Sequence, residues 1–285
     1  MISPYIALMK LRVVELLLVT TLPALFLAAD GVPPFGISLA TLLGGTLAAG
    51  AANAFNMIIE SDIDQLMDRT SKRPIVNKEV SENQAFAFAT ALTVLSLSIF
   101  WIFTNPLATA LTIGAITFYV FGYTVGLKRR TSQNIVWGGI AGCMPVLIGW
   151  AAVANSLNST AFLFFMVIFF WTPPHFWALA IKYKDDYEAA GIPMLPVVAP
   201  IAKVEQQMWF HSIAMFTTSY LTLYSAALPA WSYIANTALT TFFAIQMFSL
   251  KSSQIEKSAA KIFHGSITYL SLYSILLVAA IFITF

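Results

Sequence analysis

The chain has 285 residues, of which 59% are hydrophobic and 10% are charged, with a formal net charge of +2 and a mean hydropathy of +0.78. A chain this apolar and this poor in charge cannot build the surface of an ordinary soluble globule. The composition therefore predicts an all-α, polytopic membrane protein, and no nucleic-acid partner is expected.

Nine apolar stretches each approach the roughly 20 residues that a helix needs to cross a bilayer. They cover residues 13–30, 36–60, 84–104, 107–126, 135–155, 160–182, 206–227, 231–249 and 263–284. No stretch is left for a soluble domain, so residues 1–285 are expected to form one transmembrane domain. Spans two and six would run in the same direction, and both end in acidic, proline-bearing loops, which suggests a four-plus-four parallel repeat with one additional helix.

The basic residues predict the orientation of these spans. All 15 lysines and arginines fall before the first span or in the even-numbered loops. By the positive-inside rule this side is cytoplasmic, so the N-terminus would lie inside and the C-terminus outside. The first span lacks a small-residue cleavage site, and there is no Arg- and Ser-rich leader. The first feature indicates a true span and not a signal peptide, and the second favours the plasma membrane of a prokaryote.

Four polar side chains follow one another at intervals of four residues where the second span ends: Asn56, Glu60, Asp64 and Asp68. On a continuous helix they would share one face, where like charges repel unless a cation is present. Oxygen ligands of this kind suit Mg²⁺, which keeps its remaining positions for water and phosphate. The neighbouring Arg69, Lys72 and Arg73 would bind the same phosphates. The segment predicts a Mg²⁺-diphosphate site at a membrane surface, and the alternative is a solvated loop of mixed charge.

Two further loops carry candidate residues on the same side of the membrane. Asp185 and Asp186 follow span six and would face the first acidic segment across a central cavity if the repeat holds. The fourth loop contains Lys128, Arg129 and Arg130, which could grip a diphosphate or the carboxylates of a second substrate. Membrane topology alone would account for one or two of these cations.

Span six also contains an ionisable side chain between aromatic ones. His175 lies near the inner half of the membrane, where such residues often have a function, here as an iron ligand or a proton carrier. The alternative is a neutral histidine bonded to a carbonyl that the prolines beside it leave free. Trp171 and Trp177 could form flat walls for a planar substrate, or they could be core residues.

The acidic segment from Asn56 to Pro74 resembles the first aspartate-rich motif of the UbiA-type intramembrane prenyltransferases. Residues 127–131, 134–136, 171–177 and 191–196 more narrowly resemble the protoheme IX farnesyltransferase (heme O synthase) branch of that family. The resemblance covers nearly the whole chain. It implies nine helices around a central cavity and Mg²⁺-dependent transfer of a farnesyl group from farnesyl diphosphate to a vinyl carbon of heme b, giving heme O. It also suggests a heme A synthase or a terminal oxidase as a protein partner.

Carried over position by position, the resemblance makes Asn56, Glu60, Asp64 and Asp186 the metal-binding and catalytic residues, with Arg73 and Lys128 on the diphosphate. Two positions depart from the family pattern. Glu60 stands where the family usually has Asp, and Lys182 occupies the position four residues before Asp186 that is acidic in quinone-type members. The number of Mg²⁺ ions is therefore left open.

The chemistry needs no nucleophilic side chain. An allylic diphosphate ionises when cations neutralise the departing group, and a dry cavity protects the carbocation from water. One alternative keeps the fold but uses an aromatic quinone precursor as acceptor. Another is a transporter of an anionic metabolite, although transporters usually place their polar sites near the bilayer midplane, whereas these charges gather at one surface.

Overall fold

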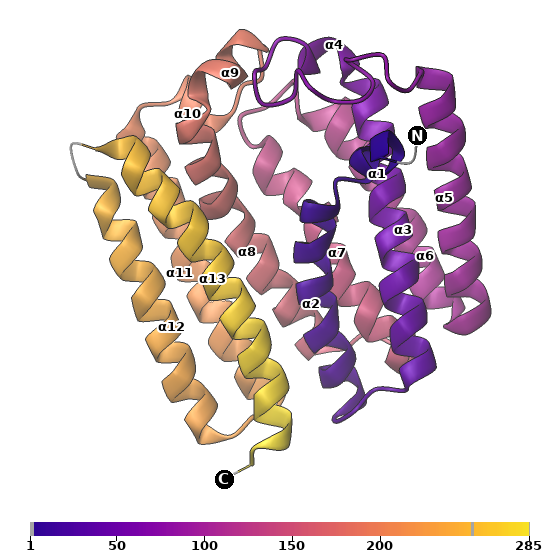
Figure 1. Ribbon diagram of the computed structural model, residues 1–285. Coiled ribbons are helices and arrows are strands. Elements are labelled where there is room, and N and C mark those ends of the chain that lie inside the picture. Colours follow the sequence, from indigo (N-terminus) through magenta and orange to yellow (C-terminus); the bar gives the residue numbers. More distant parts are fainter. Residues whose placement is uncertain (1–2, 252–253, 285) are drawn as a thin grey trace.

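The computed structural model describes residues 3–251 and 254–284, and within them every regular element is a helix (Figure 1). The long helices are α2 (Leu11–Ala29), α3 (Phe35–Ile59), α5 (Glu82–Phe103), α6 (Pro106–Thr117) with the π-helix η1 (Phe118–Leu127), α7 (Asn134–Ala154), α8 (Ser159–Lys182), α11 (Ile201–Ser225), α12 (Ala230–Phe248) and α13 (Ile255–Phe282). The short helices are α1 (Ser3–Met9), α4 (Ser61–Asp64), α9 (Lys184–Ala189), α10 (Leu195–Val198) and η2 (Ser249–Lys251).

Seven of the long segments are apolar and long enough to cross a membrane, in the part of the chain that the structure describes: α2, α3, α5, α6 with η1, α7, α8 and α13. The prediction of an all-helical, multi-pass membrane protein is confirmed. Every predicted apolar stretch coincides with a long helix. The largest differences are at α11 and α13, which begin at Ile201 and Ile255 rather than at 206 and 263 because polar residues extend their first turns.

Several helices begin at side chains that satisfy the free N–H groups of their first turn. Ser81 and Gln84 form a reciprocal capping box before α5, with N–O distances of 3.3 and 3.0 Å. Asn105 and Asn158 accept hydrogen bonds from the first turns of α6 and α8. Unpaired backbone groups are costly in lipid, so these caps fix where each helix can start.

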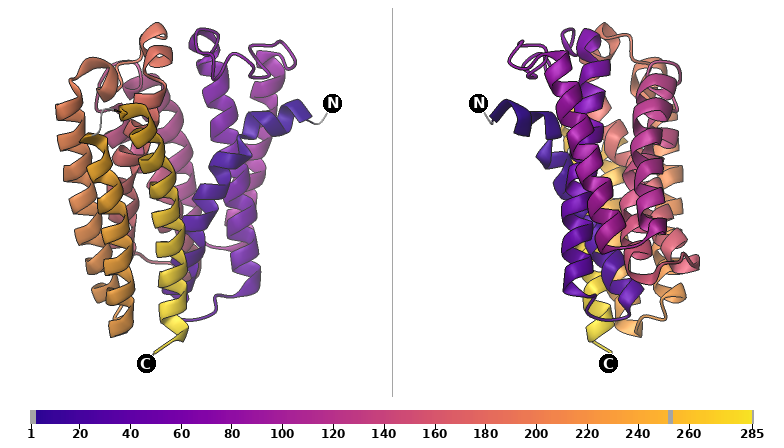
Figure 2. Two further views of the ribbon diagram at one scale, coloured as in Figure 1. Left: turned by 60° about the vertical axis from the view of Figure 1, so that its left-hand side comes forward. Right: turned by 90° about the vertical axis from the view of Figure 1, so that its right-hand side faces the viewer.

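The helices form one bundle in which α2 contacts α7 and α13, while α3 pairs with α5 and α8 pairs with α11 (Figure 2). The short helices α4, α9 and α10 gather at one end of the bundle, and α13 ends at the opposite end (Figure 1). The two acidic segments of the sequence, at α4 and α9, are therefore at the same end.

Candidate active site

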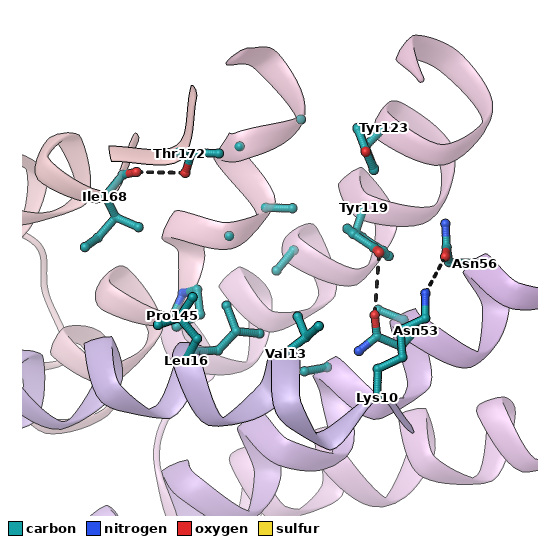
Figure 3. Close-up of a pocket in the computed structure, with 18 of the residues that line it drawn as sticks. Lys10, Val13, Leu16, Asn53, Asn56, Tyr119, Tyr123, Pro145, Ile168 and Thr172 are labelled. Carbon is teal, nitrogen blue, oxygen red and sulfur yellow. Dashed lines mark hydrogen bonds between the residues drawn. The ribbon is translucent and has the colours of Figure 1, made fainter. Parts of the chain in front are cut away.

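A cavity of about 330 Å³ lies among α2, α3, α6–η1, α7 and α8, and Figure 3 shows part of its lining. Its body is mainly apolar, whereas four basic side chains lie among its lining residues: Lys10, Arg69, Arg73 and Lys128. All four come from segments at the α4 end of the bundle or just inside it. The cavity is thus a largely hydrophobic hollow with a cationic region near one end.

Glu60 lies in this cationic region, at the junction between α3 and α4. Its side chain is only 1% exposed, and its Oε2 accepts a hydrogen bond from Lys128 Nζ at 2.6 Å. The other oxygen, Oε1, is buried and has no hydrogen-bond partner within the protein. Burial lowers the pKa of Lys128 below its ordinary value, and the neighbouring Glu60 opposes this shift. Glu60 therefore presents one unused carboxylate oxygen inside the protein.

Asp64 forms a second buried ion pair, one turn further along. Its Oδ2 accepts from Arg73 Nη1 at 2.5 Å, and its side chain is 3% exposed. Thr70 Oγ1 donates to the Asp64 carbonyl at 2.9 Å, which folds the following turns back over α4. This fold carries Arg73 to the carboxylate that it neutralises.

The predicted continuous acidic helix is wrong beyond Asp64. The α-helix α3 ends at Ile59, Glu60 has non-helical angles of φ −102° and ψ 10°, and α4 stops at Asp64. Asp68 then lies in a turn with an exposed side chain. The backbone bends because the chain leaves the bundle here, so Asn56, Glu60 and Asp64 stay buried while Asp68 does not.

Lys10 is a cavity residue that the sequence analysis used only for topology. Its Nζ donates to Asn56 Oδ1 at 2.8 Å (Figure 3). Asn56 Nδ2 in turn donates to Thr124 Oγ1 at 3.1 Å. The Lys10 backbone is left-handed, with φ 52° and ψ 55°, a conformation that costs a non-glycine residue about 1–2 kcal/mol. The available signal was a lysine directly before an apolar span, and the left-handed bend that turns it inward could not be read from that pattern.

The π-helix η1 places two tyrosines on the cavity wall. Tyr119 and Tyr123 both line the cavity, with ring centroids 5.6 Å apart, and the Tyr119 hydroxyl donates to Asn53 Oδ1 at 3.5 Å. π-Helical turns are rare and occur frequently at functional sites. Neither tyrosine was among the residues selected from the sequence.

The predicted basic residues divide into two groups. Arg69, Arg73 and Lys128 line the cavity, whereas Lys72, Arg129 and Arg130 are exposed and do not. Arg129 instead forms a two-pronged ion pair with Asp62, with distances of 2.8 and 2.6 Å. Half of the basic residues that were predicted to bind substrate therefore line the cavity.

The second acidic segment meets the first beside the cavity. Asp186 Oδ2 accepts from the Arg69 backbone N–H at 3.4 Å, and the Arg69 guanidinium donates to the Tyr187 hydroxyl at 3.4 Å. Arg69 and Tyr187 line the cavity, whereas Asp186 does not and Asp185 is exposed. The two segments, expected to face each other across a central cavity, are in direct contact beside it, and Asp186 is the aspartate that makes this contact.

The aromatic residues of α8 have different positions. Trp171 lines the cavity, and its Nε1 donates to the Ser266 carbonyl at 2.7 Å. His175 is buried between the rings of Trp171 and Phe263, at centroid distances of 4.2 and 4.5 Å, and its Nδ1 lies 2.7 Å from Ser266 Oγ. Neither His175 nor Trp177 is among the cavity-lining residues. This placement favours the structural interpretation of His175, with the Ser266 hydroxyl as a partner of its Nδ1.

Residues 17–282 match the UbiA prenyltransferase family. This chain belongs to that family. It is 50% identical over 274 residues to a protoheme IX farnesyltransferase of Renibacterium salmoninarum, covering 94% of this chain and 86% of the relative. It is 48% identical over 290 residues to a protoheme IX farnesyltransferase of Kineococcus radiotolerans, covering 95% and 86%.

Solved structures of other proteins share the fold. A digeranylgeranylglyceryl phosphate synthase matches with a TM-score of 0.80 at 15% identity, covering 98% of each chain. A UbiA homolog from Archaeoglobus fulgidus, bound to DMAPP and Mg²⁺, matches with a TM-score of 0.71 at 16% identity, covering 96% of this chain and 99% of that one. Since the identity is low, these similarities establish the fold of this UbiA-family chain.

The oxygen side chains of this UbiA-family chain fit a hard divalent cation. No group of three or more His, Cys, Asp or Glu side chains that could hold a metal occurs within residues 3–251 and 254–284. Mg²⁺, however, usually takes one or two carboxylates and fills its other positions with water and substrate phosphate. Glu60 and Asp64 supply two buried carboxylates, and the unpartnered Glu60 Oε1 is an oxygen that such an ion could use.

Proposed function

We propose that this protein transfers a farnesyl group from farnesyl diphosphate to a vinyl carbon of heme b, producing heme O. The observation that carries the proposal is a hydrophobic cavity with cations and buried carboxylates near one end. An isoprenoid diphosphate has the same division into an apolar tail and an anionic head. The similarity to curated protoheme IX farnesyltransferases over nearly the whole chain supports farnesyl as the donor group and heme b as the acceptor.

The basic side chains would bind the diphosphate head. Lys10, Arg69, Arg73 and Lys128 line the cavity, and two buried carboxylates lie among them, at Glu60 and Asp64. This leaves an excess of positive charge that a diphosphate would neutralise. Arginine and lysine both suit phosphate oxygens, and burial strengthens the attraction because water screens it less.

Mg²⁺ would be held by Asn56, Glu60 and Asp64, with Asp186 approaching from the second acidic segment. When bound, the ion would neutralise charge that develops on the departing diphosphate. Arg73 fixes the orientation of the Asp64 carboxylate, and Lys128 does the same for Glu60. Lys10 holds the Asn56 amide oxygen. The protein thus prepares the charges before the substrate arrives, so that little reorganisation is needed during ionisation.

The apolar body of the cavity would protect the allylic cation. Tyr119 and Tyr123 of η1 line it, as do Trp171 and Phe176 of α8. Aromatic faces attract cations, and a cavity without water prevents hydrolysis of the cation before the acceptor attacks. Trp171 and Phe176 would also offer flat surfaces to the porphyrin.

The full architecture is part of the same proposal. All nine long segments, including α11 and α12, would cross the membrane, with the α4 end of the bundle in the cytoplasm of a prokaryotic cell. The pairing of α3 with α5 and of α8 with α11 supports a parallel four-plus-four repeat completed by α13. The positive-inside rule places the N-terminus inside and the C-terminus outside. The site would then release its water-soluble diphosphate product at the cytoplasmic side.

The test is direct. Purified protein in detergent is incubated with heme b, labelled farnesyl diphosphate and Mg²⁺, and the hemes are separated by chromatography. A labelled, more hydrophobic heme is expected, and chelation of Mg²⁺ should abolish its formation. Failure to form this product would reject the proposal, and labelling of 4-hydroxybenzoate in a parallel reaction would establish the quinone-precursor alternative.

A further inference from the structure

We infer that two glycines in the cavity wall, Gly45 of α3 and Gly142 of α7, determine which isoprenoid length the protein accepts. The inference rests on the proposed function, because it concerns the donor of that reaction. The missing side chains at these two positions would leave room for the isoprenoid tail. This role is separate from that of the charged groups, which would bind the diphosphate.

Close packing explains several other glycines of the same two helices. A Cβ on Gly44 would lie 2.8 Å from the ring of Phe100, and one on Gly139 would lie 3.0 Å from the side chain of Thr172. Both distances are shorter than an ordinary van der Waals contact. At these positions a side chain of a neighbouring helix would have to shift to admit a larger residue, and such close approach is the usual reason for small residues between membrane helices.

Gly45 and Gly142 have no such explanation. A Cβ at either position would meet no atom within 4 Å, yet both residues line the cavity. Glycine within a helix is about 1 kcal/mol less favourable than alanine. Since no neighbouring helix requires the missing side chain, the space that it leaves belongs to the cavity and is available to a ligand.

The depth of these positions fits an isoprenoid tail. Gly45 precedes Asn56 by 11 residues, which at 1.5 Å per residue is about 16 Å along the axis of α3. Thr41 and Ile148 line the cavity still further from the cationic end. Gly142 lies 8 residues after Asn134 at the start of α7, about 12 Å from the same end of the bundle. Gly45 is therefore close to the floor, and Gly142 is closer to the middle.

A leucine at either position would fill part of the cavity that the isoprenoid chain would occupy, and the two leucines would do so at different distances from the cationic end. Gly45→Leu would occupy the deep end, where the last isoprene unit of a farnesyl chain would lie, and would leave room for the shorter geranyl chain. Gly142→Leu would narrow the middle of the cavity and obstruct both chains. Leucine is a better helix former than glycine and would meet no atom at its Cβ, so both variants should fold.

The control is Gly114→Leu in α6. A Cβ on Gly114 also meets no atom within 4 Å, but Gly114 is exposed on the outside of the bundle and does not line the cavity. All four proteins are assayed with heme b and with geranyl, farnesyl and geranylgeranyl diphosphate. Inorganic pyrophosphate has the diphosphate group of the donor but no isoprenoid chain. Thermal stabilisation by Mg²⁺ with pyrophosphate therefore measures binding at the charged end of the cavity separately.

The expected result for Gly45→Leu is a shift of the geranyl-to-farnesyl ratio of kcat/KM by tenfold or more, since small changes of pocket volume discriminate substrates by roughly 10- to 200-fold. Gly142→Leu should lower kcat/KM for both donors at least about tenfold. Stabilisation by pyrophosphate should be unchanged in every variant, and Gly114→Leu should behave as the wild type. An unchanged donor ratio in Gly45→Leu with normal pyrophosphate binding would overturn the inference, whereas absence of any prenylated heme with the wild type would instead refute the proposed function.

Discussion

The ammonium of Lys128 contacts only one of the two carboxylate oxygens of Glu60, at 2.6 Å, and the other oxygen is buried without a partner. A buried acceptor that makes no hydrogen bond is costly, by about 1–3 kcal/mol or more when it is charged. Glu60 is completely buried. An arrangement of this kind is stable only if something supplies the missing interaction, and a divalent cation shared with the substrate would do so.

Glu60→Gln tests this interaction. The amide keeps the length of the side chain and can still accept from Lys128, but it removes the negative charge. We expect the Mg²⁺ concentration for half-maximal farnesyl transfer to rise by about tenfold to hundredfold, the range found when the surroundings of a bound metal are weakened. Glu79→Gln is the matched control, because Glu79 is exposed in the loop before α5. An unchanged Mg²⁺ requirement would exclude Glu60 as a ligand.

Asp64→Asn should abolish turnover while the protein remains folded in the membrane. Asp64 is the second buried carboxylate, and its partner Arg73 would lose its counter-charge but keep an amide oxygen to bind. We expect at least a hundredfold loss of kcat, comparable to removal of one electrostatic contact in other active sites. The rate of farnesyl transfer and the thermal unfolding temperature are measured on the same variant, so that a loss of activity can be distinguished from a loss of folding. Near-normal turnover would reject Asp64 as a metal ligand.

The sequence allowed prediction of much of this arrangement because two patterns are local. Apolar length located every long helix, although α11 and α13 begin 5 and 8 residues before the predicted positions. The spacing of Asn56, Glu60 and Asp64 indicated that these three side chains lie near one another. Asp68 was misplaced because the same spacing assumes an unbroken helix, whereas the chain turns at Glu60. Composition carries no information about that turn.

The residues that the sequence analysis missed depend on tertiary structure. Lys10 enters the cavity only because the chain takes a left-handed bend between α1 and α2. Tyr119 reaches it through the π-helical geometry of η1. His175 was selected because it is an ionisable residue within a span. Its Nδ1 contacts the Ser266 hydroxyl, and its ring stacks between two aromatic rings from α8 and α13. Such contacts join residues distant in sequence and cannot be read from spacing.

Lys10→Asn tests the residue that was missed. Asparagine tolerates the left-handed conformation, so the bend should persist while the ammonium is lost. If Lys10 binds the diphosphate, KM for farnesyl diphosphate should rise by about tenfold, the equivalent of one charge-assisted hydrogen bond, and KM for heme b should change little. Lys72→Asn is the control, because Lys72 is exposed and does not line the cavity. Equal effects of the two substitutions would exclude a specific role for Lys10.

His175→Ala should affect stability rather than heme binding. The substitution empties the space between Trp171 and Phe263 and removes the contact with Ser266. Removal of a large buried side chain costs about 2–5 kcal/mol, so the thermal transition should fall by several degrees. The absorption spectrum of heme b added to the protein should match that of the wild type, and a changed spectrum would restore the iron-ligand hypothesis.

The pair formed by Asp62 and Arg129 should contribute to stability in a pH-dependent way. The hydrogen bonds from Arg129 hold the pKa of Asp62 below its ordinary value, and this carboxylate lies outside the membrane-spanning segments. A carboxylate whose pKa is lowered by folding stabilises the protein above its unfolded pKa, and this contribution is lost as the pH falls through the lowered folded pKa.

The Asp62 side chain is 61% exposed, so the pair should be worth about 1 kcal/mol or less. Asp62→Asn is therefore expected to lower the thermal transition slightly at pH 7, and its difference from the wild type should shrink below roughly pH 4, where free aspartate becomes protonated. Farnesyl transfer should change by less than about fivefold, the equivalent of 1 kcal/mol. Asp68→Asn, exposed in the neighbouring turn, provides the comparison. A difference between Asp62→Asn and the wild type that grows on acidification would show that the ion pair does not stabilise this loop.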